Sequence, residues 1–167
     1  MVSTPVDFKV EVLTEQEWWV LRDLRLTALK DYPTAFLSSY EREEAYGERR
    51  WREEFVRGEW NVIRAGERRA GLLGVTRLPD MPLQECYLEY MWVDPGFRRH
   101  GVASDLLRTV LDRIGDLGVL TVLLYILAGN DDARRLYERF GFQHTNEWQE
   151  LPGHPAGREE KMWLRLA

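Results

Sequence analysis

The stretch Trp92–Leu107, WVDPGFRRHGVASDLL, decides the fold, because it combines the end of a strand, a tight loop and the start of a helix. Strand-forming residues end at Val93, and Asp94-Pro95-Gly96 breaks the run. From Gly101 onward, apolar residues recur at helical spacing: Leu106, Leu107, Val110, Leu111 and Ile114. The stretch therefore predicts a strand that leads directly into an amphipathic helix.

The loop between this strand and this helix has features that favour the binding of an anion. The small residues Gly101 and Ala103 let a ligand approach the backbone, and the free N–H groups of a helix start attract phosphate. Arg98 and Arg99 would add positive charge. The pattern predicts a cradle for a pyrophosphate, although an ordinary helix start can have the same residues.

The segments around this join predict a crossover unit. Residues 85–93 form the most apolar predicted strand, which we expect at the centre of a sheet. The helix that follows should end near Leu117, before Gly118. Residues 121–127 form a continuous aliphatic run, typical of a strand buried on both faces and parallel to its neighbour.

The rest of the chain supplies further strands and helices. Thr14-Glu15-Gln16-Glu17 is a capping box, and it predicts a helix that ends before Pro33. We expect one helix over residues 40–56, bent at Gly47, and a further helix over residues 133–140. Gly71 and Gly74 indicate either bulges or close packing in their strand. The other predicted strands cover residues 6–13, 60–65, 69–77, 142–151 and 159–166.

Composition narrows the class of protein. A chain of 167 residues is the size of one domain, so we expect residues 1–167 to form a single unit. The net charge of −5 argues against a nucleic-acid binder, and no apolar run is long enough to cross a membrane. The start of the chain does not resemble a secretory signal, which favours a cytoplasmic protein. The single cysteine, Cys86, and the three histidines show no spacing typical of a metal site.

Four motifs occur in a fixed order: Val93-Asp94-Pro95, Arg98-x-x-Gly101-x-Ala103, Asn130-x-x-Ala133-x-x-x-Tyr137 and Gly141-Phe142. Together they resemble the GNAT superfamily of acetyl-CoA-dependent N-acetyltransferases, over the whole chain. The resemblance implies a mixed α/β (α+β) fold, with a twisted sheet of about seven strands and four helices on its two faces. His100 stands where the superfamily more often has arginine.

The resemblance also implies where coenzyme A would bind. The backbone from Arg98 to Ala103 would hold the pyrophosphate, and the hydroxyl of Ser104 would assist. Trp92 and Val93 would pair with the pantetheine arm, and Asn130 would bond to the same arm or cap its helix. The implied cofactor-binding residues are Trp92, Val93, Arg98, Arg99, His100, Gly101, Val102, Ala103, Ser104, Asn130, Ala133 and Tyr137.

Two residues are candidates for proton transfer. The resemblance gives Tyr137 the role of the acid that serves the departing thiolate, and the alternative is an aromatic residue in the core. An ammonium group must lose a proton before it attacks, so a carboxylate is expected nearby. Glu89 in the central strand is our candidate, and a salt bridge or a solvent-facing position is its alternative. Glu41 and Glu44 are reserves.

The acceptor is the least determined part of this hypothesis. By analogy with the superfamily, residues 33–40 and 152–157 should wall the acceptor pocket, with Phe36, Tyr40, Glu41, Tyr125 and His154 as lining candidates. A small-molecule amine is favoured. A protein or peptide acceptor, and a regulatory domain that binds acyl-CoA without turnover, are the alternatives. The aromatic last strands, with Trp148 and Trp163, leave a homodimer open.

Overall fold

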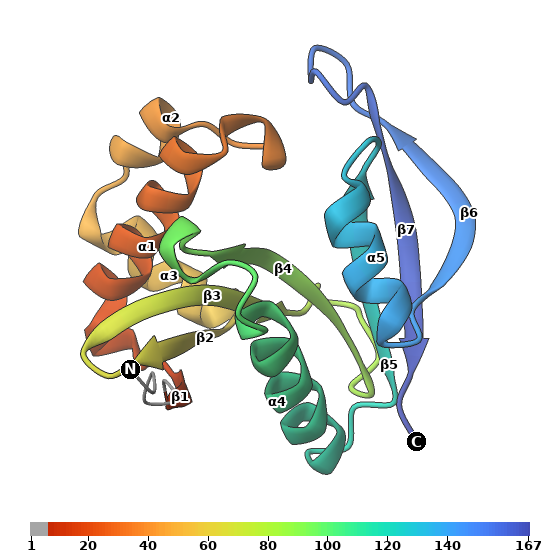
Figure 1. Ribbon diagram of the computed structural model, residues 1–167. Helices are drawn as coiled ribbons and strands as arrows, with labels where there is room; N and C mark the ends of the chain where they lie inside the picture. The colour runs from red at the N-terminus through yellow and green to blue at the C-terminus, as the bar shows by residue number, and fades with distance from the viewer. Residues whose placement is uncertain (1–6) are drawn as a thin grey trace, which may run out of the picture.

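The computed structural model describes residues 7–167, and its centre is one seven-stranded sheet in the order β1-β2-β3-β4-β5-β7-β6. Figure 1 shows the sheet passing from β1 near the N-terminus to β6 and β7 near the C-terminus. The strands are β1 Phe8–Val12, β2 Gly58–Ala65, β3 Arg68–Thr76, β4 Glu85–Val93, β5 Thr121–Leu127, β6 Gln143–Glu150 and β7 Arg158–Arg165. Residue 6, the first of the predicted N-terminal strand, lies outside the described residues.

The crossover unit predicted from the sequence is confirmed. Strand β4 and strand β5 are parallel, and every other neighbouring pair is antiparallel. Helix α4, Val102–Asp116, connects them and ends near Gly118, whose φ of 92° is the left-handed conformation that glycine adopts readily.

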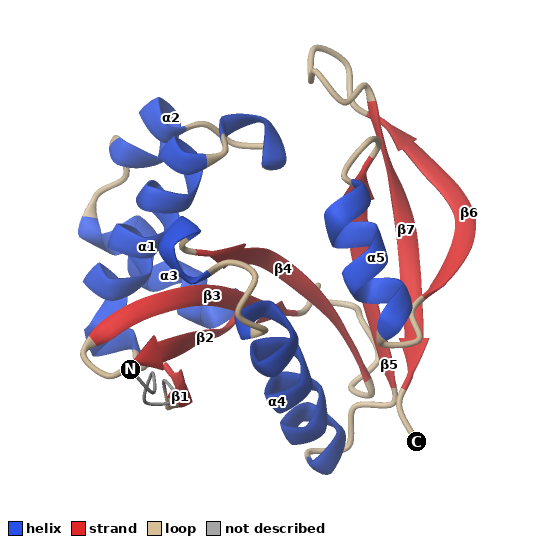
Figure 2. Cartoon of the chain, in the orientation of Figure 1, coloured by secondary structure: helices blue, strands red, loops and turns tan. Residues whose placement is uncertain are grey.

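Helices cover both faces of the sheet (Figure 2). Helix α1, Trp18–Asp31, packs on one face, where Leu21, Leu24 and Leu29 meet Trp60 and Trp92. Helices α4 and α5, Asp131–Arg139, pack on the other face. The two faces thus have separate apolar cores. The predicted capping box also forms, since the carboxylate of Glu17 accepts from the backbone N–H of Thr14 at 2.9 Å.

The expectation of a single bent helix over residues 40–56 is wrong, and with it the expected total of four helices. The segment forms two helices, α2 Tyr40–Glu44 and α3 Glu48–Arg57, which raises the number of α-helices in the described residues to five. Gly47 between them has φ −75° and ψ 169°, an extended conformation that no helix interior contains. Gly47 is the N-cap of α3, so the chain stops and restarts there.

Gly74 has both of the properties expected of a glycine in this strand. The register of β3 and β4 shifts between Leu72 and Gly74, and a Cβ at Gly74 would lie 2.4 Å from the Trp60 ring. Trp60 is fully buried, so it has little room to move. We expect Gly74→Ala to lower the free energy of unfolding by about 1–3 kcal/mol, as overpacking does, measured by urea denaturation.

Gly47→Ala is the matched control for Gly74→Ala, because nothing lies within 4 Å of a Cβ at that position. Its cost should stay below about 1 kcal/mol, the usual range for a change of N-cap residue. Equal losses for the two variants would contradict the close packing of Gly74 against Trp60.

Candidate active site

The sheet opens where β4 and β5 separate. They pair only over Glu85–Tyr87 and Thr121–Leu123, and then β4 continues beside β3 while β5 continues beside β7. Figure 2 shows the two strands diverging from this point. Carboxyl ends of parallel strands that separate are common places for ligands, because backbone groups there lack a neighbouring strand. The opening also connects the two faces of the sheet.

A β-bulge in β4 lies beside this opening. Gly74 is opposite Glu89 and Leu72 is opposite Trp92, so Tyr90 and Met91 together face one residue of β3. Tyr90 has φ 57°, which is uncommon for a residue other than glycine. The extra residue changes the alternation of the strand. Two consecutive residues, Glu89 and Tyr90, therefore both line a cavity on the α1 face of the sheet.

A cavity of about 490 Å³ lies on the α1 face of the sheet, over the opening. Its walls come from α1, α2, α3 and the segment between α1 and α2, and its floor comes from β4, β5 and β7. The lining combines charged side chains, described below, with seven aromatic ones: Phe36, Tyr46, Trp51, Trp60, Tyr87, Tyr90 and Tyr125. Tyr87 and Tyr125 are stacked, with centroids 6.0 Å apart. The cavity is suited to an organic ligand rather than to a bare ion.

The predicted lining residues divide into three groups. Phe36 and Tyr125 line the cavity. His154 lies in the β6–β7 loop, and its Nε2–H donates to the Phe36 carbonyl at 3.1 Å, so this loop touches the cavity wall. Tyr40 and Glu41, at the start of α2, are outside this lining, and their role in the acceptor pocket stays a prediction. The Tyr40 hydroxyl instead donates to Glu44 along α2, at 2.7 Å.

Glu89 lines the cavity and forms an ion pair there. Its carboxylate accepts from Nη2 of Arg57, the last residue of α3, at 2.7 Å. Burial lowers the pKa of Arg57, but the bond to Glu89 and the charges of Glu89, Tyr90 and Glu54 together outweigh this effect. The net pKa is therefore raised, and the guanidinium stays charged. Arg57 also contacts Glu54, at 3.1 Å. Sequence reasoning missed Arg57, because the ion pair joins residues 32 positions apart.

The α4 side of the opening carries the phosphate-binding candidates. Gly101, with φ 78°, is the N-cap of α4, and no side chain caps this helix within the described chain. The backbone N–H groups of Val102, Ala103 and Ser104 have no backbone acceptor within residues 7–167. The start of α4 thus has the free donors that a pyrophosphate needs.

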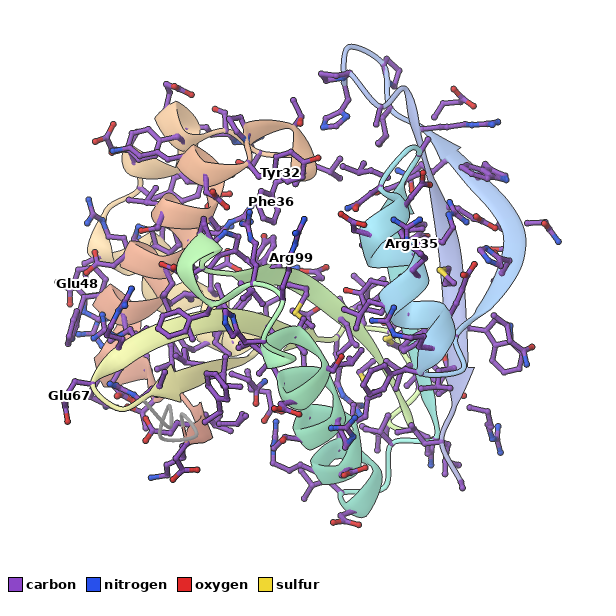
Figure 3. All side chains as sticks on the ribbon, in the orientation of Figure 1. Tyr32, Phe36, Glu48, Glu67, Arg99 and Arg135 are labelled. Carbon is purple, nitrogen blue, oxygen red and sulfur yellow. The ribbon has the colours of Figure 1, made fainter. Side chains whose placement is uncertain are left out.

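The arginines and the histidine of this loop have different roles. The Arg98 guanidinium binds Asp31 of α1 and the Val93 carbonyl, so part of the positive charge expected from Arg98 is already balanced. Arg99 is exposed and forms no ion pair with residues 7–167, which leaves its charge available. In Figure 3, Arg99 lies below Phe36, on the loop before α4. His100 folds back, with Nδ1 2.7 Å from the Arg98 carbonyl.

Trp92 and Val93 point to opposite faces. The Trp92 side chain is buried among the α1 residues and donates to Asp31 at 2.9 Å, so only its backbone is left for a cofactor. Val93 packs on the α4 side. On α5, the Asn130 side chain accepts from the backbone N–H of Ala133 at 3.3 Å and caps the helix. This bond uses the amide oxygen of Asn130 and leaves its NH₂ group available.

Tyr137 is on α5, on the α4 face of the sheet. Its ring packs in that core and meets Phe142 edge-on, with centroids 5.4 Å apart. Its hydroxyl has no hydrogen-bond partner among residues 7–167, and burial raises the pKa of the phenol. The group therefore stays protonated near neutral pH. It can donate a hydrogen bond to an anion that forms beside it.

The neighbouring arginines of α5 are held in ion pairs. Arg134 contacts Glu160 of β7 at 3.0 Å, and Arg135 contacts Asp132 at 2.7 Å. Arg135, labelled in Figure 3, is the more exposed of the two.

Within residues 7–167, no helix is long and apolar enough to span a membrane.

Comparisons with known proteins agree with this geometry. The model of the acetyltransferase (GNAT) family matches residues 16–142. The chain is 30% identical over 87 residues to the uncharacterized N-acetyltransferase YdgE of Bacillus subtilis, which covers 52% of this chain and 55% of that protein. It is 29% identical over 96 residues to the ribosomal protein bS18-alanine N-acetyltransferase of Escherichia coli, covering 58% of this chain and 65% of that one. The chain thus spans less than two thirds of either relative.

A solved structure shares the fold. The PaiA N-acetyltransferase from Thermoplasma acidophilum, in complex with coenzyme A, aligns with a TM-score of 0.71 and 15% identity, over 96% of this chain and 99% of that one. At this identity the likeness concerns the fold alone.

Proposed function

This chain belongs to the acetyltransferase (GNAT) family, and we propose that it transfers the acetyl group of acetyl-CoA to a primary amine. The observation that carries the proposal is the position of the opening between β4 and β5. The uncapped start of α4 and Tyr137 lie on one face of the sheet, and the aromatic cavity lies on the other. Two substrates can therefore approach from opposite faces and meet at the opening.

The residues of the α4 side fit coenzyme A. A Cβ at Gly101 would have nothing within 4 Å, so the backbone there is open to a ligand. Val102, Ala103 and Ser104 would hold the pyrophosphate through their N–H groups, Arg99 would balance its charge, and the Asn130 amide would bond to the pantetheine arm. Bound acetyl-CoA supplies the acetyl group in activated form, as a thioester. Tyr137 would donate to the departing sulfur.

A small-molecule acceptor is the class that the cavity favours. The contact between His154 and Phe36 ties the β6–β7 loop to the segment between α1 and α2, which supplies part of the cavity wall. A peptide acceptor would need an open groove there. The relatives support amine acetylation in general, since the Escherichia coli enzyme is named for an alanine of a ribosomal protein.

Ala103→Glu tests the cofactor site. A carboxylate at the second position of α4 would occupy the anion site and repel phosphate, so we expect calorimetric affinity for coenzyme A to fall by at least about tenfold. Arg108→Glu is the control, because this residue is exposed and lies further along α4. Equal affinity for wild type and Ala103→Glu would contradict the site.

A thiol-release assay with a panel of amines tests the reaction. The panel contains 2-phenylethylamine, 1,4-diaminobutane, L-alanine and the tripeptide amide Ala-Ala-Ala-NH₂. We expect thiol release with a small amine. Coenzyme A binding without release for any amine would favour the regulatory alternative, and release with the tripeptide alone would favour a peptide acceptor.

A further inference from the structure

Four carboxylates line the cavity on the α1 face: Glu43, Glu54, Glu89 and Glu159. Three of them are paired with arginine: Glu43 with Arg25 at 2.9 Å, Glu54 with Arg50 at 2.7 Å, and Glu89 with Arg57 at 2.7 Å. Glu159 is buried, yet within residues 7–167 its carboxylate has neither an ion pair nor a hydrogen bond. A largely buried carboxylate without a protein partner is costly, and this one opens into the cavity, so a cationic ligand there would supply the missing partner.

The position of Glu159 follows from the alternation of β7. Glu160 and Met162 face the α5 side, where Glu160 bonds to Arg134 and Met162 joins the core. Glu159 consequently faces the cavity, and it is opposite Leu127 at the end of β5. Leu127 and Tyr125 line the cavity as well. Glu159 thus stands on the β5 side of the opening, and Glu89 stands on the β4 side.

The surroundings of Glu159 make it a better base than an ordinary glutamate. Burial raises the pKa of its carboxyl, the charge of Glu89 raises it further, and His154 opposes these effects. His154 itself is not free to take a proton from a substrate. Its Nδ1 accepts from the backbone N–H of Ala156 at 3.1 Å, and its Nε2–H donates to Phe36. Glu89, in turn, is held by Arg57.

We propose that Glu159, rather than Glu89, binds the ammonium group of the acceptor and takes its proton. The inference rests on the proposed acetyl transfer. The ammonium gives one proton to the Glu159 carboxylate, and the neutral amine nitrogen then bonds to the acetyl carbon while the carbon–sulfur bond breaks. Tyr137 gives its phenolic proton to the thiolate and regains one from the acylated nitrogen. Glu159 finally releases its proton to solvent, so charge and atoms balance.

In this arrangement Glu89 is a positioning residue. Its ion pair with Arg57 fixes the bulged part of β4 against the end of α3 and supports the aromatic wall at Tyr90, which Arg57 also contacts. The stacked rings of Tyr87 and Tyr125 would lie beside the carbon stem of the amine. An amine with an aromatic or aliphatic stem fits such a site, with its ammonium at Glu159.

The test compares Glu159→Gln with wild type, with 2-phenylethylamine as the acceptor. We expect kcat/KM at neutral pH to fall by about 10²-fold, the scale of general base catalysis, and calorimetric affinity for coenzyme A to stay unchanged. The acidic limb of the pH profile should disappear, and the activity of the variant should rise at high pH, where solution supplies neutral amine. Calorimetry without acetyl-CoA should also show weaker binding of 2-phenylethylamine.

Glu150→Gln is the matched control, because Glu150 is an exposed carboxylate on the adjacent strand β6. It should behave as wild type. A Glu159→Gln enzyme with unchanged kcat/KM and amine affinity would overturn the inference, and loss of the acidic limb in Glu89→Gln instead would assign the proton to Glu89. Failure of acetyl transfer itself is distinguishable, since wild type would then release no thiol with any amine of the panel.

Discussion

Tyr137→Phe should lower kcat by about 10²-fold and leave affinity for coenzyme A and the amine nearly unchanged. The Tyr137 phenol, on the α4 face of the sheet, is our proposed donor to the departing sulfur, and removal of one donor to a developing anion typically has an effect of this size. A thiolate has a pKa near 8.5, below that of a phenol. Because burial raises the pKa of Tyr137 further, we expect the residue to stabilise the departing sulfur first by a hydrogen bond.

The variant leaves the packing of the core intact. The Tyr137 hydroxyl bonds to nothing in residues 7–167, and phenylalanine keeps the edge-on contact with Phe142, so the midpoint of thermal unfolding should not fall. Tyr32→Phe is the control, because Tyr32 is exposed at the end of α1 (Figure 3). An unchanged kcat in Tyr137→Phe would return this residue to a purely structural role, and a raised KM without a change in kcat would make it a binding residue.

Much of the fold could be predicted from the sequence, because hydrophobic periodicity and turn residues act locally. The run over residues 121–127, the strands over residues 60–65 and 69–77 and the helix start at Gly101 all have the predicted structure. The split between α2 and α3 was missed for a different reason. Gly47 is compatible with a bent helix or with a break, and the choice depends on how the flanking helices pack against the rest of the molecule.

The candidate site was predictable on one side of the sheet only. The loop at Gly101 and the cap at Asn130 are continuous motifs, so residue types and spacing identify them. The cavity side depends on pairings between distant segments, as Arg57 with Glu89 illustrates. The bulge at Tyr90 also escapes periodicity, because it changes which face later residues occupy. For Glu159 a signal existed: Met162 in the core predicts that Glu159 faces the other side.

The three arginine–glutamate ion pairs of the cavity wall affect the charge of the cavity as well as its shape. Three pairs hold α1, α2, α3 and β4 around the cavity and neutralise six charges. Two charged side chains of the lining are outside any ion pair within residues 7–167: the cation Arg42 on α2 and, as the one carboxylate, Glu159. We expect a cationic acceptor to bind at that one carboxylate, because the other three carboxylates of the lining already have arginine partners. The pairs thus build the walls of the site and also direct the amine toward the β4–β5 opening.

Glu43→Gln should be the most destabilising of the variants described here, with a loss of about 3–5 kcal/mol in the free energy of unfolding. Glu43 accepts from both Nε and Nη2 of Arg25 at 2.9 Å, and the two side chains are 6% and 2% exposed. The substitution would leave the Arg25 guanidinium buried without its counter-charge. Arg25 Nη1 already lacks a partner within the described chain, so the site has no spare acceptor to replace the carboxylate.

The loss should extend to the acceptor site, because Arg25 lies between the rings of Phe36 and Tyr90, 4.5 and 3.8 Å from their centroids. Urea denaturation measures the stability, and KM for 2-phenylethylamine reports on the cavity wall. Glu53→Gln is the control, since Glu53 forms an exposed ion pair with Arg49. This substitution should lower the free energy of unfolding by less than about 0.5 kcal/mol.

The double variant Arg25→Met/Glu43→Leu should recover much of the stability but should keep the altered KM. Apolar residues can replace a buried ion pair in packing, but they do not restore the guanidinium stacked on the two rings. Recovery of both would contradict a role for Arg25 in shaping the cavity.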